Sequence, residues 1–204
     1  MKADGATRIY LCGVGGQGSL TASRLLGEAA ILADLPVTVS EVHGMSQRGG
    51  IVESTVLLGG PKSPLIGKND ADVLLAFEPL EALRALPYCA AKTVAVVNTH
   101  PIVPFTVTMG QSAYPEVESM LATVRGAVGR LYALDATQLA EEAGNAQAVN
   151  AVMLGALAGA NTLPLTGEMM RRIVTESVPA KFRATNEKAF SLGLAAIQRQ
   201  PATG

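Results

Sequence analysis

The stretch that decides the fold is RIYLCGVGGQGSLTASRLLGEAAILADLPVTVSE, residues 8–41. Its first five residues, 8–12, form a short apolar run that is typical of a buried strand. A glycine-rich turn occupies residues 13–18, and residues 19–34 then repeat apolar side chains at helical spacing. Pro36 ends that helix, and residues 37–41 are again typical of a strand. The pattern therefore predicts a strand, a tight turn, a helix and a second strand.

Strands and helices alternate along the rest of the chain until its last third. Further strands are predicted at 51–58, 72–77, 93–98 and 130–134, and helices at 79–86, 115–129, 136–143, 146–160, 167–177 and 186–198. Such alternation favours an α/β domain with a mainly parallel sheet. We therefore predict one domain over residues 1–204, a three-layer α/β/α architecture with a mainly parallel or mixed sheet and a helical C-terminal third.

Composition excludes several classes of protein. The chain has 204 residues, 49% apolar and 16% charged, which excludes a disordered or coiled-coil chain. The net charge of −1 gives no electrostatic footprint for nucleic acid or for an anionic membrane. The longest apolar run, residues 151–160, is too short to span a bilayer. We expect neither a nucleic-acid partner nor a membrane partner.

The two cysteines, Cys12 and Cys89, do not lie in a CxxC pair. Two thiols cannot hold a four-cysteine iron–sulfur cluster or a cysteine-rich zinc site, so we expect no metal held by this chain alone. They also form no disulfide framework, and the first 16 residues show no signal peptide. The sequence therefore favours a cytoplasmic location.

The glycine-rich turn has the spacing GxGxxG at Gly13, Gly15 and Gly18, with Gly16 and Gln17 between them. Glu41 ends the next predicted strand 23 residues after Gly18, as a dinucleotide fingerprint requires. Backbone N–H groups of such a turn, together with a helix N-terminus, favour an anion. Three interpretations stay open: a stand-alone dinucleotide-binding oxidoreductase of Rossmann type, a turn that needs glycine only for packing, and a contact with a phosphate of a larger assembly.

The second unusual stretch is EVHGMSQRGG, residues 41–50, between two predicted strands. Loops at the carboxyl ends of parallel strands are where α/β sheets place ligands, so we interpret it as a ligand or subunit-contact loop. The alternative is a satisfied polar turn in which Arg48 pairs with Glu41. The residues of this loop that we assign to the candidate site are Glu41, His43, Gly44, Ser46, Gln47, Arg48 and Gly49.

Catalytic chemistry within this loop has two candidates, His43 as a general base and Arg48. The spacing around Ser46 matches no nucleophile elbow, and the sequence shows no third orienting group. A metal held by Glu41, His43 and His100 is weakly supported, because the two histidines are far apart in the sequence.

Two further features have open alternatives. Glu78 and Glu81 follow a predicted strand, so they either present carboxylates at the edge of the sheet or lie in the first turn of a helix. The helix predicted at 146–160 is apolar almost all round, so it is either a central helix of this domain or part of a subunit interface. Residues 181–183 are expected to form a solvated turn.

Three longer strings carry a resemblance to a known family: GVGGQGSLTASRLLGEAA (13–30), EVHGMSQRGG (41–50) and ADVLLAFEPLEALR (71–84). Together they resemble the gamma-type subunits of 2-oxoacid:ferredoxin oxidoreductases, and most of all the small subunits of the indolepyruvate type. The resemblance continues more weakly through residues 150–157 and through the last helix at Asn186, Ala189, Phe190 and Gly193, so it covers nearly the whole chain.

The resemblance implies a role as an accessory subunit. Enzymes of this family oxidatively decarboxylate a 2-oxo acid to an acyl-CoA and pass the electrons to ferredoxin, with thiamine diphosphate, Mg and [4Fe-4S] clusters held by the large subunit in the indolepyruvate type. A related domain of single-chain pyruvate enzymes is associated with coenzyme A, which the resemblance extends to the glycine-rich turn and to Gln47 and Arg48. It implies a large partner subunit, ferredoxin as a partner through the complex, and an isolated chain that is inactive. Apart from the resemblance, an exposed apolar patch on a chain of such low net charge would favour a homodimer when the chain is isolated.

One position departs from the family pattern. Related sequences usually continue the second loop with Gly-Gly-Ser or Gly-Gly-Ala and a valine-rich strand that often bears a His or Arg, whereas this chain has Ile51, Val52 and Glu53 after its two glycines. We expect Glu53 to alter partner contacts or substrate preference.

Overall fold

The computed structural model describes residues 5–43, 50–60, 63–103, 107, 109–110 and 113–200. Six strands form one sheet in the order β2-β3-β1-β4-β5-β6. They are β1 Thr7–Val14, β2 Val37–His43, β3 Ile51–Leu58, β4 Val73–Ala76, β5 Val94–Asn98 and β6 Arg130–Leu134. β3 runs antiparallel to both of its neighbours, whereas β1, β4, β5 and β6 pair in parallel. The prediction of a mainly parallel, mixed sheet is confirmed.

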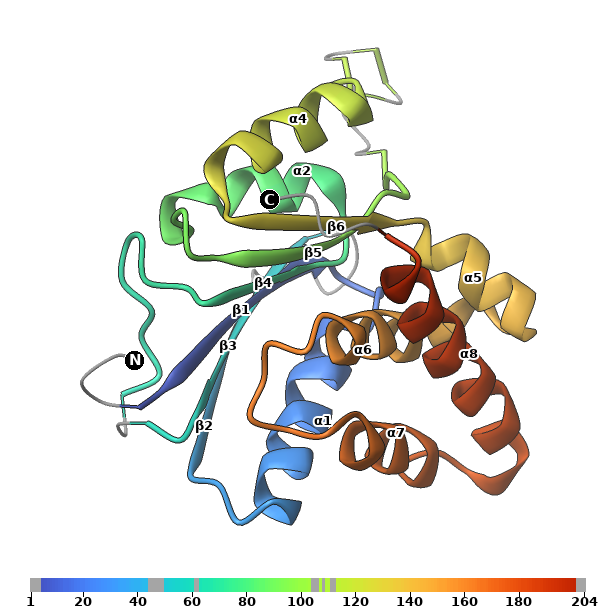
Figure 1. The fold of residues 1–204 in the computed structure, drawn as a ribbon. Helices are drawn as coiled ribbons and strands as arrows, with labels where there is room; N and C mark the ends of the chain where they lie inside the picture. Colours follow the sequence, from blue (N-terminus) through green and yellow to red (C-terminus); the bar gives the residue numbers. More distant parts are fainter. Residues whose placement is uncertain are drawn as a thin grey trace.

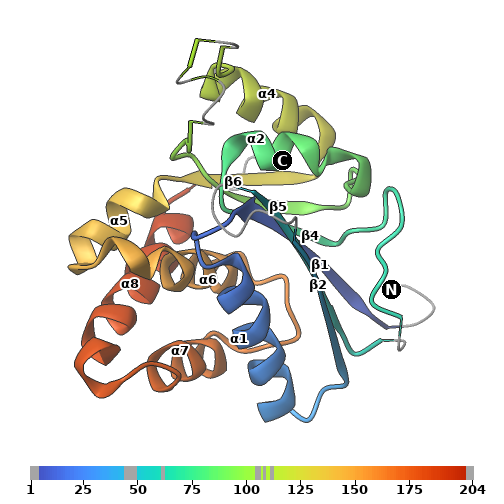
Figure 2. The ribbon, with the colours of Figure 1, turned by 180° about the vertical axis from the view of Figure 1, so that it is seen from behind.

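Helices cover both faces of the sheet, as Figures 1 and 2 show. One face carries α1 Ser19–Leu32, α5 Ala136–Ala143, α6 Val149–Gly159, α7 Gly167–Glu176 and α8 Ala180–Gln198. The other face carries α2 Pro79–Arg84 and α4 Val117–Ala127. Two short 3₁₀ turns are η1 Leu86–Tyr88 and η2 Ala146–Ala148. This is the predicted three-layer arrangement with a helical C-terminal third.

Alternate residues of the central strands supply the two cores. In β1, Ile9 and Leu11 pack towards α1 and α6, whereas Tyr10 and Cys12 pack towards α2. Because both faces of the strand are buried, its sequence is a continuous apolar run and not an alternating one. The same reasoning explains why the four residues of β4 are all buried.

The start of the last helix differs from the prediction. α8 begins at Ala180, so residues 181–183 lie in its first turn and not in a solvated turn. Residues 180–184 are exposed, and the first buried side chain of the helix is that of Asn186. Hydrophobic periodicity therefore gives no signal for the first two turns of α8.

α6 is a central helix of this fold, which decides one of the alternatives left open by the sequence. It packs against α8, α5 and α7, and eight of its residues are buried. Glycines allow its backbone to approach that of α8: a Cβ atom at Gly155 would lie 2.0 Å from the Phe190 carbonyl oxygen, and one at Gly193 would lie 1.9 Å from the Val152 carbonyl oxygen.

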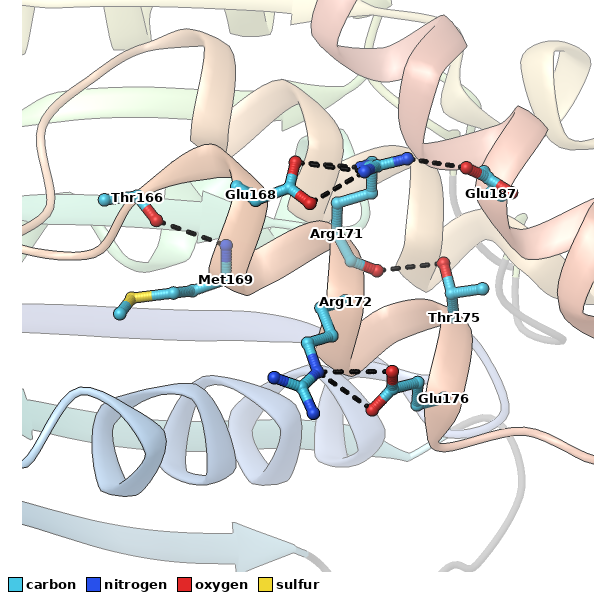
Figure 3. Close-up of polar contacts among 8 residues, drawn as sticks. All are labelled: Thr166, Glu168, Met169, Arg171, Arg172, Thr175, Glu176 and Glu187. Atoms are coloured by element: carbon cyan, nitrogen blue, oxygen red, sulfur yellow. Dashed lines mark hydrogen bonds and ion pairs between the residues drawn. The ribbon is translucent and has the colours of Figure 1, made fainter.

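Ion pairs on the surface connect α7 to α8, as Figure 3 shows. The Arg171 guanidinium donates to Glu168 within α7 at 2.8 Å and to Glu187 of α8 at 2.6 Å. The hydrogen bond from Arg171 lowers the pKa of the Glu168 carboxyl. These charged groups are exposed to solvent, so the ion pairs add little to the stability of the fold.

Candidate functional site

The two stretches singled out in the sequence meet at the carboxyl edge of the sheet. The glycine-rich turn joins the end of β1 to α1, and the connection from β2 to β3 lies at the same edge because β3 runs antiparallel. The Gly15 N–H donates to the Gly50 carbonyl oxygen at 2.9 Å, which links the turn to the end of the second loop. Residues 44–49 lie outside the described residues; they include the candidates Gly44, Ser46, Gln47, Arg48 and Gly49.

The side chain of Gln17 holds the glycine-rich turn in place through two hydrogen bonds. Its Oε1 atom accepts the Val14 N–H at 2.8 Å, and its Nε2 atom donates to the Phe77 carbonyl oxygen at 2.6 Å. The Asn98 Nδ2 atom donates to the same carbonyl oxygen at 3.1 Å. The turn is thereby fixed to the ends of β4 and β5, two strands that are remote in sequence.

Several N–H groups of the turn are already bonded within the chain. The Val14, Gly15 and Gln17 N–H groups are taken by Gln17 Oε1, Gly50 O and Val14 O. Gly18 caps α1 with a φ of 84° and has no side chain that could accept the first N–H groups of the helix. These first-turn N–H groups are the donors that the turn can offer to an anion.

Packing explains one glycine of the fingerprint. A Cβ atom at Gly13 would lie 2.9 Å from Phe77 Cβ and 3.0 Å from Gln17 Oε1. A side chain at this position would therefore displace the glutamine that braces the turn. For Gly13, the packing interpretation is sufficient.

The position of Glu41 does not match a dinucleotide site. In the fold that binds dinucleotides, the acidic residue ends the strand next to β1. Here β3 lies between β1 and β2, which places β2 about 10 Å from β1. Glu41 Oε1 instead accepts a hydrogen bond from Ser23 Oγ of α1 at 3.0 Å. β2 extends to His43, but the side chain of His43 lies outside the described residues.

Glu78 is a buried carboxylate at the same edge of the sheet, with 1% of the residue exposed. Its Oε2 atom accepts the Leu80 and Glu81 N–H groups at 2.7 and 3.1 Å and thereby caps α2. Its Oε1 atom accepts the Ile102 N–H at 3.2 Å and the Tyr114 hydroxyl. Four donors therefore satisfy this carboxylate, so the structure supports its role at the helix terminus.

Two neighbouring groups are affected by this environment. Burial, with the hydrogen bond to Glu78, raises the pKa of the Tyr114 hydroxyl, which therefore stays a proton donor. Glu81 lies in the first turn of α2, where Arg84 contacts its carboxylate at 2.6 Å. Burial raises the pKa of Glu81, although Arg84 opposes that shift.

Metal ligands do not gather in the part of the chain that the structure describes. No group of three His, Cys, Asp or Glu side chains is close enough there to hold an ion. His100 Nδ1 lies 3.8 Å from Asp135 Oδ2, with both side chains partly exposed. The His43 side chain lies outside the described residues, and so does the predicted site that Glu41, His43 and His100 would share.

Both cysteines are buried free thiols. Burial raises the pKa of the Cys12 thiol well above its usual range and that of Cys89 to about 11. Because the thiolate is the reactive form, we expect both to react with a thiol-specific reagent at pH 8 about 100-fold more slowly in the native chain than in urea. Thiol titration by absorbance measures both rates, and rapid native labelling of either cysteine would contradict the burial described here.

Comparison with known proteins places the chain in a family. The family profile described as pyruvate ferredoxin/flavodoxin oxidoreductase matches residues 8–196. The chain belongs to the pyruvate ferredoxin/flavodoxin oxidoreductase family. It is 38% identical over 188 residues to indolepyruvate oxidoreductase subunit IorB of Methanothermobacter thermautotrophicus, covering 92% of this chain and 96% of the relative. It is 43% identical over 192 residues to the protein of the same name from Pyrococcus horikoshii, covering 93% and 95%.

Solved structures share the fold of this family member. The gamma subunit of a keto/oxoacid ferredoxin oxidoreductase from Geobacter sulfurreducens aligns with a TM-score of 0.68 at 23% identity, covering 95% of this chain and 99% of that one. A 2-oxoglutarate:ferredoxin oxidoreductase from Magnetococcus marinus aligns with a TM-score of 0.73 at 20% identity, covering 97% of this chain but 32% of the other. In that second protein, the same fold is one part of a longer chain.

Several contacts of this site were missed by sequence reasoning. The bridge from Gln17 and Asn98 to Phe77 and the bond from Tyr114 to Glu78 join segments 21 to 60 residues apart. One of these contacts had a signal in the sequence, because Asn98 is a polar residue at the end of an otherwise apolar buried strand.

In the described part of the chain, no helix is long and apolar enough to cross a membrane.

Proposed function

We propose that this chain is the small accessory subunit of an indolepyruvate:ferredoxin oxidoreductase. The observation that carries the proposal is the near full-length match, at 38% and 43% identity, to relatives named as subunits of indolepyruvate oxidoreductase. The complex would oxidatively decarboxylate an aryl pyruvate to its acyl-CoA and pass the electrons to ferredoxin.

The cofactors of such a complex do not fit this chain alone. A [4Fe-4S] cluster takes four thiolates, whereas the chain has two cysteines and buries both. The Cys89 thiol donates to the Ala85 carbonyl oxygen at 3.6 Å, so it is used inside the fold. We therefore assign thiamine diphosphate, Mg and the clusters to a large partner subunit, where thiamine diphosphate would supply the decarboxylation and the clusters would accept the electrons.

The part of this chain that we assign to the function is the carboxyl edge of the sheet. The N-cap of α1 is a glycine, which offers no side-chain acceptor to the first N–H groups of the helix, and the loop bearing Gln47 and Arg48 begins and ends at this edge. Backbone N–H groups at a helix start and a guanidinium are both ligands for phosphate groups. We propose that they help to place coenzyme A at the entrance to the partner's active site.

Arg48→Ala tests the role of this loop in the assembled enzyme. Because a charge-assisted hydrogen bond contributes roughly 1.5–3 kcal/mol, we expect the KM for coenzyme A to rise about 10-fold or more while assembly is unaffected. Gln47→Ala should have a smaller effect in the same direction. Steady-state assays of the complex with indolepyruvate and a ferredoxin measure both.

Arg125→Ala is the matched control, because Arg125 lies on the exposed surface of α4. The control should leave turnover and the KM unchanged. If Arg48→Ala also leaves turnover and the KM for coenzyme A unchanged, the loop has no binding role and the chain acts as a scaffold. Oxidoreductase turnover by the isolated chain, with no large subunit present, would overturn the proposed function itself.

A further inference from the structure

Exposed apolar side chains concentrate at the β2 edge of the molecule. Six of the nine large apolar residues exposed in the described chain lie on α1, β2, β3 or the connection after β3. They are Ile31, Leu32, Val39, Val42, Ile51 and Leu65, and Val42 is 64% exposed. They lie on both sides of the β2 edge, and a concentration of exposed apolar side chains at one edge favours a protein–protein contact there.

The outer backbone edge of β2 is unpaired within the described part of the chain. β2 is the first strand of the sheet order and bonds to β3 on one side, as its outermost position in Figure 1 shows. Its seven residues, VTVSEVH, include no proline and no lysine. Natural edge strands that stay free are usually shortened, charged or covered, so a bare strand of this length indicates a place for another strand.

A hollow lies on each face of β2. On the α1 side, a groove of about 470 Å³ is lined by Leu20, Ile31, Val37 and Val39 among others, and it is mainly apolar. On the opposite face, a smaller pocket of about 130 Å³ is lined by Ser40, Val42, Glu53, Leu65 and Tyr88 among others. Since side chains of a strand alternate between faces, a strand added to β2 would place its residues in these two hollows in turn.

The smaller pocket contains one carboxylate, that of Glu53. Glu53 pairs with Val42 of β2 in the sheet register, so its side chain lies on the same face as that of Val42, and the hydroxyl group of the buried Tyr10 lies on this face too. Burial, together with the hydrogen bond to Glu53, raises the pKa of the Tyr10 hydroxyl. Charged groups across an interface are arranged to be complementary, so the Glu53 carboxylate at this edge favours an occupant that brings hydrogen-bond donors and positive charge.

We infer that an extended segment of the large partner subunit pairs with β2 as an added strand and places a basic side chain beside Glu53. The inference rests on the proposed function, which supplies that partner. The pocket has room for one long side chain and is smaller than an ordinary small-molecule site. A second copy of this chain fits less well, because β2 contains no Lys or Arg that could meet Glu53.

Hydrogen–deuterium exchange on the purified complex and on the isolated chain tests the pairing directly. In the complex, we expect slower exchange for the amides over residues 37–43, at least 10-fold for those that face outward, because pairing sequesters them. Equal exchange of these amides in both samples would overturn the inference. If the isolated chain protects them equally well in a concentration-dependent dimer, the occupant is a second copy and the inference is also wrong.

Variants test the chemistry of the occupant. Val42→Asp should weaken binding of the large subunit at least 10-fold, whereas Val103→Asp, at another exposed valine, should leave binding unchanged. Glu53→Gln should weaken binding about 10-fold or more and reduce its salt dependence, because it removes one member of a buried charge pair. Melting temperatures of the isolated variants confirm that each is folded.

The outcomes distinguish a failure of the proposed function from a failure of the proposed strand pairing at β2. If the chain co-purifies with no large subunit, the proposed function fails. If the complex forms but Val42→Asp and Val103→Asp bind equally tightly, the docking edge is wrong while the proposed function stands. If Glu53→Gln binds as well as the unmodified chain, no basic side chain occupies the smaller pocket.

Discussion

Gly193→Ala is expected to lower the free energy of unfolding by about 3 kcal/mol or more. A Cβ atom at this position would lie 1.9 Å from the Val152 carbonyl oxygen and 3.0 Å from the Ala156 backbone nitrogen. Both neighbours are backbone atoms of α6, so no side chain can rotate away and the two helices must separate. Overpacking of a tightly packed core usually costs about 1–3 kcal/mol, and a backbone clash lies at or above the top of that range.

Urea denaturation followed by circular dichroism measures this loss, with Gly126→Ala as the control. Gly126 lies in α4, and a Cβ atom there would meet nothing within 4 Å. The control should gain up to about 1 kcal/mol, because alanine favours a helix over glycine. If Gly193→Ala is as stable as the control, the contact between α6 and α8 is not as close as described.

Glu78→Ala is expected to cost about 3–5 kcal/mol of stability. The substitution removes the acceptor for two N–H groups at the start of α2, for the Ile102 N–H and for the Tyr114 hydroxyl. Each buried donor that is left without a partner costs about 1–3 kcal/mol, less where water enters the space. The segment around Ile102 and Tyr114 should also lose its attachment to α2.

Glu116→Ala provides the matched control, because Glu116 is the N-cap of α4 and makes no side-chain hydrogen bond there. It should change stability by less than about 0.5 kcal/mol. Glu78→Gln should be intermediate, because an amide keeps one acceptor oxygen but turns its NH₂ group towards the remaining donors. Equal stability of Glu78→Ala and Glu116→Ala would show that the buried carboxylate contributes nothing.

Most secondary structure was predictable because it depends on local pattern. The apolar runs identify β1, β4 and β5, and Pro36 marks the interval between α1 and β2. The place of β3 between β1 and β2 was not predicted, because strand pairing depends on contacts that are remote in sequence. A signal existed, since the short connection between β2 and β3 leaves no room for a crossover helix and therefore requires an antiparallel pair.

The candidate site was predicted in outline only. The sequence identified the glycine-rich turn, and the structure places Gly50 against it, which joins the two singled-out stretches. The sequence could not indicate that Gln17 turns inward to Phe77, or that Glu78 receives Tyr114. Such side-chain contacts depend on the fold as a whole, and the polar residues that form them have no periodicity.

Anaerobic affinity purification of the tagged chain from its own cells shows whether the chain works as a subunit. Mass, iron and thiamine diphosphate are then measured on the purified material. We expect a stoichiometric large subunit that carries iron and thiamine diphosphate, and indolepyruvate-dependent reduction of ferredoxin by the complex. An iron-free chain that purifies without a large subunit would show that the chain is not a subunit of such an enzyme.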